Sequence, residues 1–183
     1  MSRRKRGAVN KKTKPAKRKT RDPRGHDAAL REHLAALLKG GGAHARFSRV
    51  IADFPADKRG SVAGGLQHTA WQLLEHLRIA QWDILEFSRN AKHVSPKFPE
   101  GYWPKTAGPA DEAAWDQSVA SFEKDLRGMI ALVKNPKADL YAKIAHGDAQ
   151  TILREALVLA DHNSYHLAQI VDLRRALGVW KAS

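Results

Sequence analysis

The hydrophobic residues of this chain recur at helical spacing in several separate stretches. Across residues 66–89 they repeat at steps of one, three and four residues, which is the period of one helix face. This stripe reads Leu73, His76, Leu77, Ala80, Ile84 and Phe87. A similar stripe predicts a helix over residues 111–134, closed by Pro136 and formed by Trp115, Val119, Phe122, Leu126, Ile130 and Val133.

Two further helices complete the pattern. We predict a last helix over residues 149–177, stopped by Gly178, and a shorter one over residues 28–39, capped by Asp27 and stopped by the glycines at 40–42. A brief helical piece over residues 43–53 ends before Pro55. Because no strand-like alternation with hairpin turns occurs, the sequence predicts an all-α, four-helix bundle.

The connections differ in character. Residues 55–65 form a polar loop that contains glycine. Residues 94–109 contain four prolines together with Tyr102 and Trp103. Since tryptophan is scarce in flexible linkers, we expect an ordered loop pinned by its aromatic residues.

The positive charge is concentrated at the N-terminus. The net charge is +13, and residues 1–25 hold 12 Lys/Arg against the single acid Asp22, a charge of +11. This leaves 13 − 11 = +2 for the rest. Self-repulsion and the lack of apolar surface predict a disordered tail over residues 1–25, followed by a helical domain over residues 26–183.

Some classes of protein are excluded by what the sequence lacks. It has no cysteine, so a disulfide framework, a thiolate metal site and a cysteine nucleophile are excluded. No stretch of 18 or more apolar residues occurs, so we expect no membrane span. The Arg3-Arg4 pair lacks a following apolar region, which argues against a secretion signal, and a cytoplasmic location is the expectation.

Histidines interrupt the apolar stripes of two helices. His162 and His166 are four residues apart, so they lie one turn apart on the seam that faces the bundle interior. His76 is the polar residue in the stripe of residues 66–89 and can supply a third nitrogen. Three imidazoles with the remaining positions open are typical of a catalytic metal site, and zinc or nickel suits such ligands.

The alternative is that these histidines are hydrogen-bonded core residues, and the spacing alone does not decide between the two. Asp161 and Gln169 flank the pair and can orient an imidazole or a water. His68 is a further candidate near the site. His146 lies in a loop and can approach the mouth of the site, although a position at the surface is the main expectation. No usable partner spacing is found for His26, His33, His44 and His93.

Longer segments resemble the DinB/YfiT-like superfamily. The likeness is carried by residues 160–169 (ADHNSYHLAQ), 71–83 (WQLLEHLRIAQWD), 100–104 (EGYWP) and 146–148 (HGD), and it extends from about Leu30 to Trp180. It implies a four-helix bundle that is commonly a dimer, with His76, His162 and His166 as the metal ligands. Ala168 departs from the family, which often has glycine there, and its methyl group is expected to tighten helix packing or narrow the site.

Three functions follow as hypotheses. The first is a metal-dependent enzyme, a hydrolase or a small-thiol-dependent transferase, in which the ion lowers the pKa of a water or of a substrate thiol. Glu75 and Asp83 are candidate acid/base groups, although both are expected to face solvent. The second is a nucleic-acid-associated protein whose basic tail neutralises phosphates. The third is a metal-binding scaffold without catalysis. The substrate is not identified by the sequence.

Overall fold

The computed structural model describes residues 23–181, which contain helices and no strand. The main helices are α1 (Pro23–Lys39), α3 (Ala70–Arg89), α4 (Glu112–Lys134) and α5 (Ile152–Ala176). The short helix α2 (Phe47–Ile51) and two single-turn 3-10 helices, η1 (Ala56–Lys58) and η2 (Glu100–Tyr102), lie in the connections. The predicted all-α class with four main helices is confirmed.

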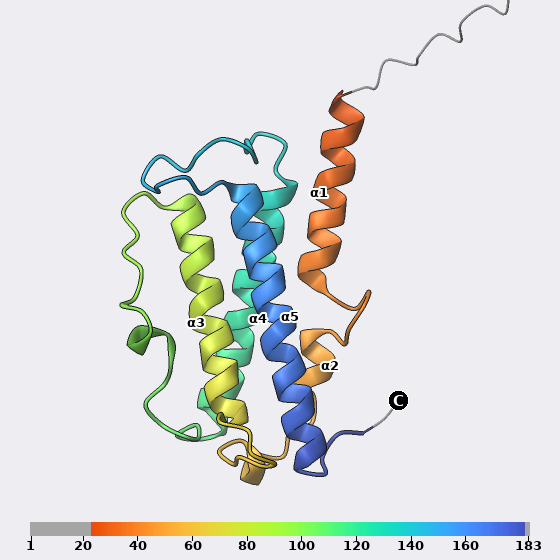
Figure 1. Ribbon diagram of the computed structural model, residues 1–183, viewed down its shortest axis with the longest axis vertical. Helices are drawn as coiled ribbons and strands as arrows, with labels where there is room; N and C mark the ends of the chain where they lie inside the picture. Colours follow the sequence, from red (N-terminus) through yellow and green to blue (C-terminus); the bar gives the residue numbers. More distant parts are fainter. Residues whose placement is uncertain (1–22, 182–183) are drawn as a thin grey trace, which may run out of the picture.

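The helices pack as a bundle in which α4 and α5 each contact both α1 and α3 (Figure 1). Helices α3 and α4 run in the same direction, so the segment between them returns along the length of the bundle (Figure 1). This return brings η2 and the residues that follow it alongside α3. The predicted ordered loop therefore packs against the bundle and is not a flexible linker.

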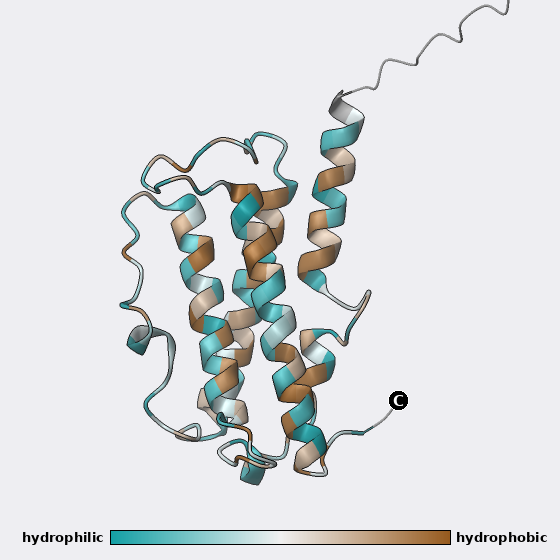
Figure 2. Cartoon of the chain, viewed as in Figure 1, coloured by the Kyte–Doolittle hydropathy of each residue, from teal (hydrophilic) through white to brown (hydrophobic). Residues whose placement is uncertain are grey.

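The apolar stripes of the helices meet in the interior. Brown and teal residues alternate along each helix in Figure 2, as expected for amphipathic helices. The fully buried side chains with the largest volumes include Phe122, Leu74, Leu77, Leu85, Met129, Leu159 and Ile170. Within residues 23–181, no helix combines the length and the apolar character that crossing a membrane requires.

Local capping sets the helix starts, and it places two of them later than predicted. Helix α3 begins at Ala70 because Thr69 and Gln72 form a capping box, each side chain bonded to the other's backbone N–H. Helix α5 begins at Ile152 because the Thr151 side chain accepts from the backbone N–H of Arg154. The predicted starts at residues 66 and 149 were wrong for this reason. The predicted second piece shortens to Phe47–Ile51.

The first helix begins earlier than predicted. It starts at Pro23, a residue suited to the first helical turn, so it extends into the predicted tail of residues 1–25. Asp27 is therefore inside the helix and does not cap it; its carboxylate instead accepts from Arg31 at 2.7 Å. The rest of the predicted tail, residues 1–22, lies outside the described residues.

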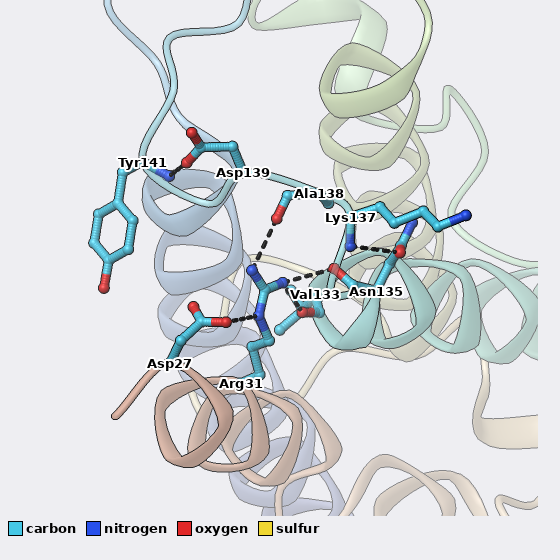
Figure 3. Close-up of polar contacts among 8 residues, drawn as sticks. All are labelled: Asp27, Arg31, Val133, Asn135, Lys137, Ala138, Asp139 and Tyr141. Atoms are coloured by element: carbon cyan, nitrogen blue, oxygen red, sulfur yellow. Dashed lines mark hydrogen bonds and ion pairs between the residues drawn. The ribbon is translucent and has the colours of Figure 1, made fainter. Parts of the chain in front are cut away.

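A buried arginine fastens α1 to the end of α4 (Figure 3). The Arg31 guanidinium donates, at 2.8 Å each, to the carbonyl oxygens of Val133, Asn135 and Ala138. These carbonyls lie at or just beyond the C-terminus of α4, where backbone acceptors lack helical partners and a positive charge is favourable. The contact holds α1 against the C-terminal end of α4.

Candidate metal centre

The three histidines predicted as ligands converge in the bundle. His76 lies in the second turn of α3, and His162 and His166 lie one turn apart on α5. The Nε2 atom of His76 is 3.0 Å from Nε2 of His162 and 3.1 Å from Nε2 of His166. Their candidate ligand atoms all lie within 4.8 Å of one another. The helical spacing therefore predicted the cluster correctly.

Hydrogen bonds at the outer nitrogens fix which ring nitrogen faces the centre. Nδ1 of His76 is 2.9 Å from the backbone carbonyl oxygen of Tyr102, which can only accept, so Nδ1 carries the proton. Nδ1 of His166 similarly donates to Oε1 of Gln169 at 2.7 Å. In both neutral rings Nε2 is then an unprotonated acceptor that points into the cluster.

This arrangement fits a bound cation. The Nε2 atoms of His76 and His166 present lone pairs to each other at 3.1 Å, and no hydrogen bond can form between two acceptors. Imidazole nitrogens that share one ion at about 2.0–2.1 Å are themselves roughly 3 Å apart, as these are. The hydrogen bonds at Nδ1 of His76 and His166 are those expected of histidine ligands, whereas Nδ1 of His162 is buried without a hydrogen-bond partner.

Burial keeps the three rings neutral. It lowers the pKa of His76 to about 4, against a smaller opposing effect of the Tyr102 carbonyl. Burial, followed by repulsion from His166 and His76, lowers the pKa of His162 to about 4. The pKa of His166 is also lowered by burial, although its bond to Gln169 opposes the change. Metal ligands must be unprotonated, and these rings meet that condition at neutral pH.

An aromatic stack and a cavity adjoin the cluster. The ring of Trp103 lies parallel to that of His76, with centroids 3.9 Å apart and planes within 2°. On its other side the indole stacks on His68 at 4.1 Å. A cavity of about 390 Å³ opens beside His166, and its other lining residues are Gly65, Leu66, Gln67, His68, Leu73, Trp103, Tyr165 and Gln169. None of these residues is Asp, Glu, Lys or Arg.

Of the residues predicted to lie near the histidine cluster, some contact it or line its cavity and others do not. The prediction that Gln169 orients an imidazole is confirmed. His68, a further candidate near the site, lines the cavity beside the cluster. Asp161 is exposed and has no part in this orientation. His146 is exposed, as expected, and its Nε2 donates to the carbonyl oxygen of Phe87 at 2.8 Å.

The expectation that Glu75 and Asp83 face solvent was wrong. The Glu75 side chain is 12% exposed and accepts from Arg78 at 2.7 Å and from Ser118 at 2.5 Å. Burial acts to raise the pKa of Glu75, but these bonds outweigh it and the pKa falls below its usual value. Asp83 is buried and bonded to two other side chains. Neither carboxylate lines the cavity beside the cluster.

The partners of Asp83 were not found from the sequence. His93, for which no partner was predicted, donates from Nε2 to Asp83 Oδ1 at 2.7 Å. The Tyr102 hydroxyl donates to Asp83 Oδ2 at 2.6 Å. Burial and the neighbouring carboxylate raise the pKa of Tyr102, so its hydroxyl keeps its proton. One signal was available: Asp83 follows His76 by seven residues, two helical turns, on the same buried side.

The sequence matches the model of the DinB superfamily over residues 41–170, well over half of the chain. The chain belongs to the DinB superfamily. The matched region of this DinB-superfamily protein contains all three clustered histidines, the loop with Tyr102 and Trp103, and the cavity. No curated protein and no solved structure matches the chain.

Ala168, where the resemblance led us to expect glycine, lies away from the histidines' cavity. It is exposed and lines a separate cavity of about 250 Å³, together with His44, Val171 and Trp180 among others. Its methyl group therefore does not narrow the three-histidine site.

Proposed function

We propose that this DinB-superfamily protein is a divalent-metal-dependent enzyme, with His76, His162 and His166 as ligands of zinc or nickel. The observation that carries the proposal is the convergence of three Nε2 atoms beside a cavity of about 390 Å³. Three protein ligands leave coordination positions open, as in catalytic sites. When bound, the ion supplies Lewis acidity that lowers the pKa of a coordinated water or thiol.

The cavity favours a small, uncharged and partly apolar substrate. Leu66, Leu73 and Trp103 supply apolar surface, and the Gln67 and Gln169 amides and the Tyr165 hydroxyl supply hydrogen-bonding groups. No arginine or lysine in the lining can balance a phosphate or a carboxylate. A volume of about 390 Å³ falls within the range of small-molecule sites, roughly 300–1,000 Å³.

Thiol transfer suits the site better than hydrolysis. The carboxylates Glu75 and Asp83 are bonded elsewhere, and none lines the cavity to act as a general base for water. A thiol of ordinary pKa, roughly 8.5, is more acidic than water and ionises on a metal without such a base. Because the chain has no cysteine, the thiol is a co-substrate. Its sulfur forms a bond to an electrophilic carbon of the second substrate, the leaving group departs with its electron pair, and the thiol proton passes to solvent.

The test is turnover of a neutral aromatic halide by zinc- or nickel-loaded protein, with and without a small thiol. Thioether and halide formed only when thiol and metal are both present would support the proposal, and His162→Ala should abolish the reaction. Equal turnover without thiol would favour hydrolysis. Binding of the ion without turnover over a panel of neutral electrophiles would favour a non-catalytic scaffold.

The basic segment supports a second, separate proposal: contact with nucleic acid through residues 1–25. Its 12 Lys/Arg can neutralise several phosphates and release their counterions. Such binding is independent of sequence and weakens as salt rises. The test compares the whole chain with a variant in which these cations are replaced by glutamine, measuring DNA and RNA affinity against salt concentration. Equal affinities of the two proteins would refute the proposal.

Assembly as a homodimer is also proposed, on the family resemblance alone. The molar mass in solution measured by light scattering tests it, because a dimer has twice the chain mass of 20.3 kDa. A value near 20.3 kDa at all concentrations would refute it.

A further inference from the structure

A buried hydrogen-bonded group lies two turns along α3 from the metal ligand His76. Asp83 is 8% exposed, and its two carboxylate oxygens accept separately from His93 and Tyr102. The side chain of His93 is itself only 5% exposed. An isolated buried carboxylate is costly, so both donors are needed to keep it there. We call Asp83, His93 and Tyr102 the loop anchor.

The loop anchor is connected to the proposed metal ligand His76 through Tyr102. Tyr102 is bonded to α3 at two points: its hydroxyl donates to Asp83, and its backbone carbonyl accepts from Nδ1 of His76 at 2.9 Å. The next residue, Trp103, covers the face of the His76 ring. The position of one short piece of loop therefore determines both the hydrogen bond and the stacking that orient this imidazole.

Two fixed points on α3 restrict the loop more than one would. The carbonyl contact alone leaves residue 102 free to turn about that bond, which would tilt the His76 ring and separate it from the indole. The hydroxyl contact prevents this turn, because Asp83 is held by a rigid helix and by His93. Hydrogen-bonding partners behind a histidine ligand typically change metal affinity by about 10–100-fold when removed.

We propose that Asp83, His93 and Tyr102 are positioning residues of the metal site, which hold the segment around residues 102–103 so that His76 presents Nε2 to the ion. This inference rests on the proposed metal-binding function. It assigns these residues no contact with the substrate or the ion. It accounts for a buried acid that the chemistry of the site does not use.

The structure offers a matched control. Tyr102→Phe removes a hydroxyl that donates to Asp83 of α3, and Ser118→Ala removes a hydroxyl that donates to Glu75 of the same helix. Both variants lose one hydrogen bond to a largely buried carboxylate, so both should unfold at lower urea concentration. Only Tyr102→Phe removes a contact of the loop anchor.

The experiment measures the zinc affinity of the folded proteins by competition with a chromophoric chelator. We expect Tyr102→Phe and Asp83→Ala to bind zinc about 10-fold or more weakly than the natural chain, whereas Ser118→Ala binds as the natural chain does. Asp83→Asn retains an oxygen acceptor for Tyr102 and should bind more tightly than Asp83→Ala. The visible spectrum of the cobalt-loaded protein should change in Tyr102→Phe and not in Ser118→Ala.

Unchanged zinc affinity and cobalt spectra in Tyr102→Phe and Asp83→Ala, with normal binding by the natural chain, would overturn the loop anchor alone. Failure of the natural chain to bind zinc, nickel or cobalt would overturn the proposed function. The anchor is then decided by ¹⁵N NMR of His76 in the metal-free protein. A proton confined to Nδ1 in the natural chain and exchanged between both nitrogens in Tyr102→Phe would support it; identical His76 spectra would refute it.

Discussion

A hydrogen-bonded bridge between side chains in the core should contribute several kcal/mol to the free energy of unfolding, and its two side chains should be energetically coupled. Gln81 of α3 is fully buried; its amide nitrogen donates to the carbonyl oxygen of Phe122 in α4 at 2.5 Å. Its amide oxygen accepts from the side chain of Asn163 in α5 at 3.0 Å. Because Asn163 is the neighbour of His162 in the sequence, this bridge joins the two helices that carry the clustered histidines.

The perturbation is Gln81→Met, which keeps the length and volume of the side chain and removes both polar atoms. The amide of Asn163, 6% exposed, then loses its partner in the core. An unsatisfied buried group costs about 1–3 kcal/mol, and the lost bond to Phe122 costs about 1 kcal/mol more. We therefore expect the free energy of unfolding to fall by about 2–4 kcal/mol.

A double-mutant cycle with Asn163→Leu, followed by urea denaturation in the presence of a chelator, tests the reasoning. Once Gln81 is methionine, replacing Asn163 removes a group that was already unpaired. The double variant should then be more stable than the sum of the two single losses predicts, by about 1–3 kcal/mol. Losses that add to within about 0.5 kcal/mol would show that the two side chains are not coupled, and the bridge would be refuted.

Three further outcomes are expected. In the metal-free protein, the pKa values of His76 and His162 are lowered to about 4 from the usual 6.5. The stability that these neutral rings confer is therefore present above pH 6.5 and is lost as the pH falls toward 4. Urea midpoints that stay level between pH 7 and 4.5 would contradict this. Trp103→Leu removes two ring stacks and should lower the free energy of unfolding, measured by urea denaturation, by about 1–3 kcal/mol. Trp103→Phe should be intermediate in stability between Trp103→Leu and the natural chain. Equal losses in the two variants would argue against stacking. Ala168→Gly should cost about 0.5–1 kcal/mol by helix propensity alone and leave zinc affinity unchanged; weaker zinc binding would show that this residue does act on the site.

The fold and the histidine cluster were predictable because both depend on helical periodicity. A repeat of three and four residues specifies which side of a helix is buried, and His76, His162 and His166 share that repeat with the core. The helix starts were less accurate. They depend on single capping contacts, such as Thr69 with Gln72, which the apolar pattern does not contain.

The loop anchor could not be predicted in the same way. Asp83 occupies a buried helical position, but its partners His93 and Tyr102 come from a segment without periodicity. Their positions depend on how that segment returns along the bundle between two parallel helices (Figure 1). The partner of Gln81 in α5 depends likewise on tertiary packing, since a polar residue on a helix is by default expected to face solvent.

The measurement that tests the central claim most directly is the metal content of the protein purified without a metal-affinity tag. Elemental analysis should find about one zinc or nickel ion per chain, as expected for one site of three imidazole ligands. His162→Ala, purified in the same way and shown by circular dichroism to be helical, should contain almost none. A natural chain that stays free of metal after incubation with zinc and nickel, or a His162→Ala variant that retains a full equivalent, would contradict the assignment of these histidines as ligands.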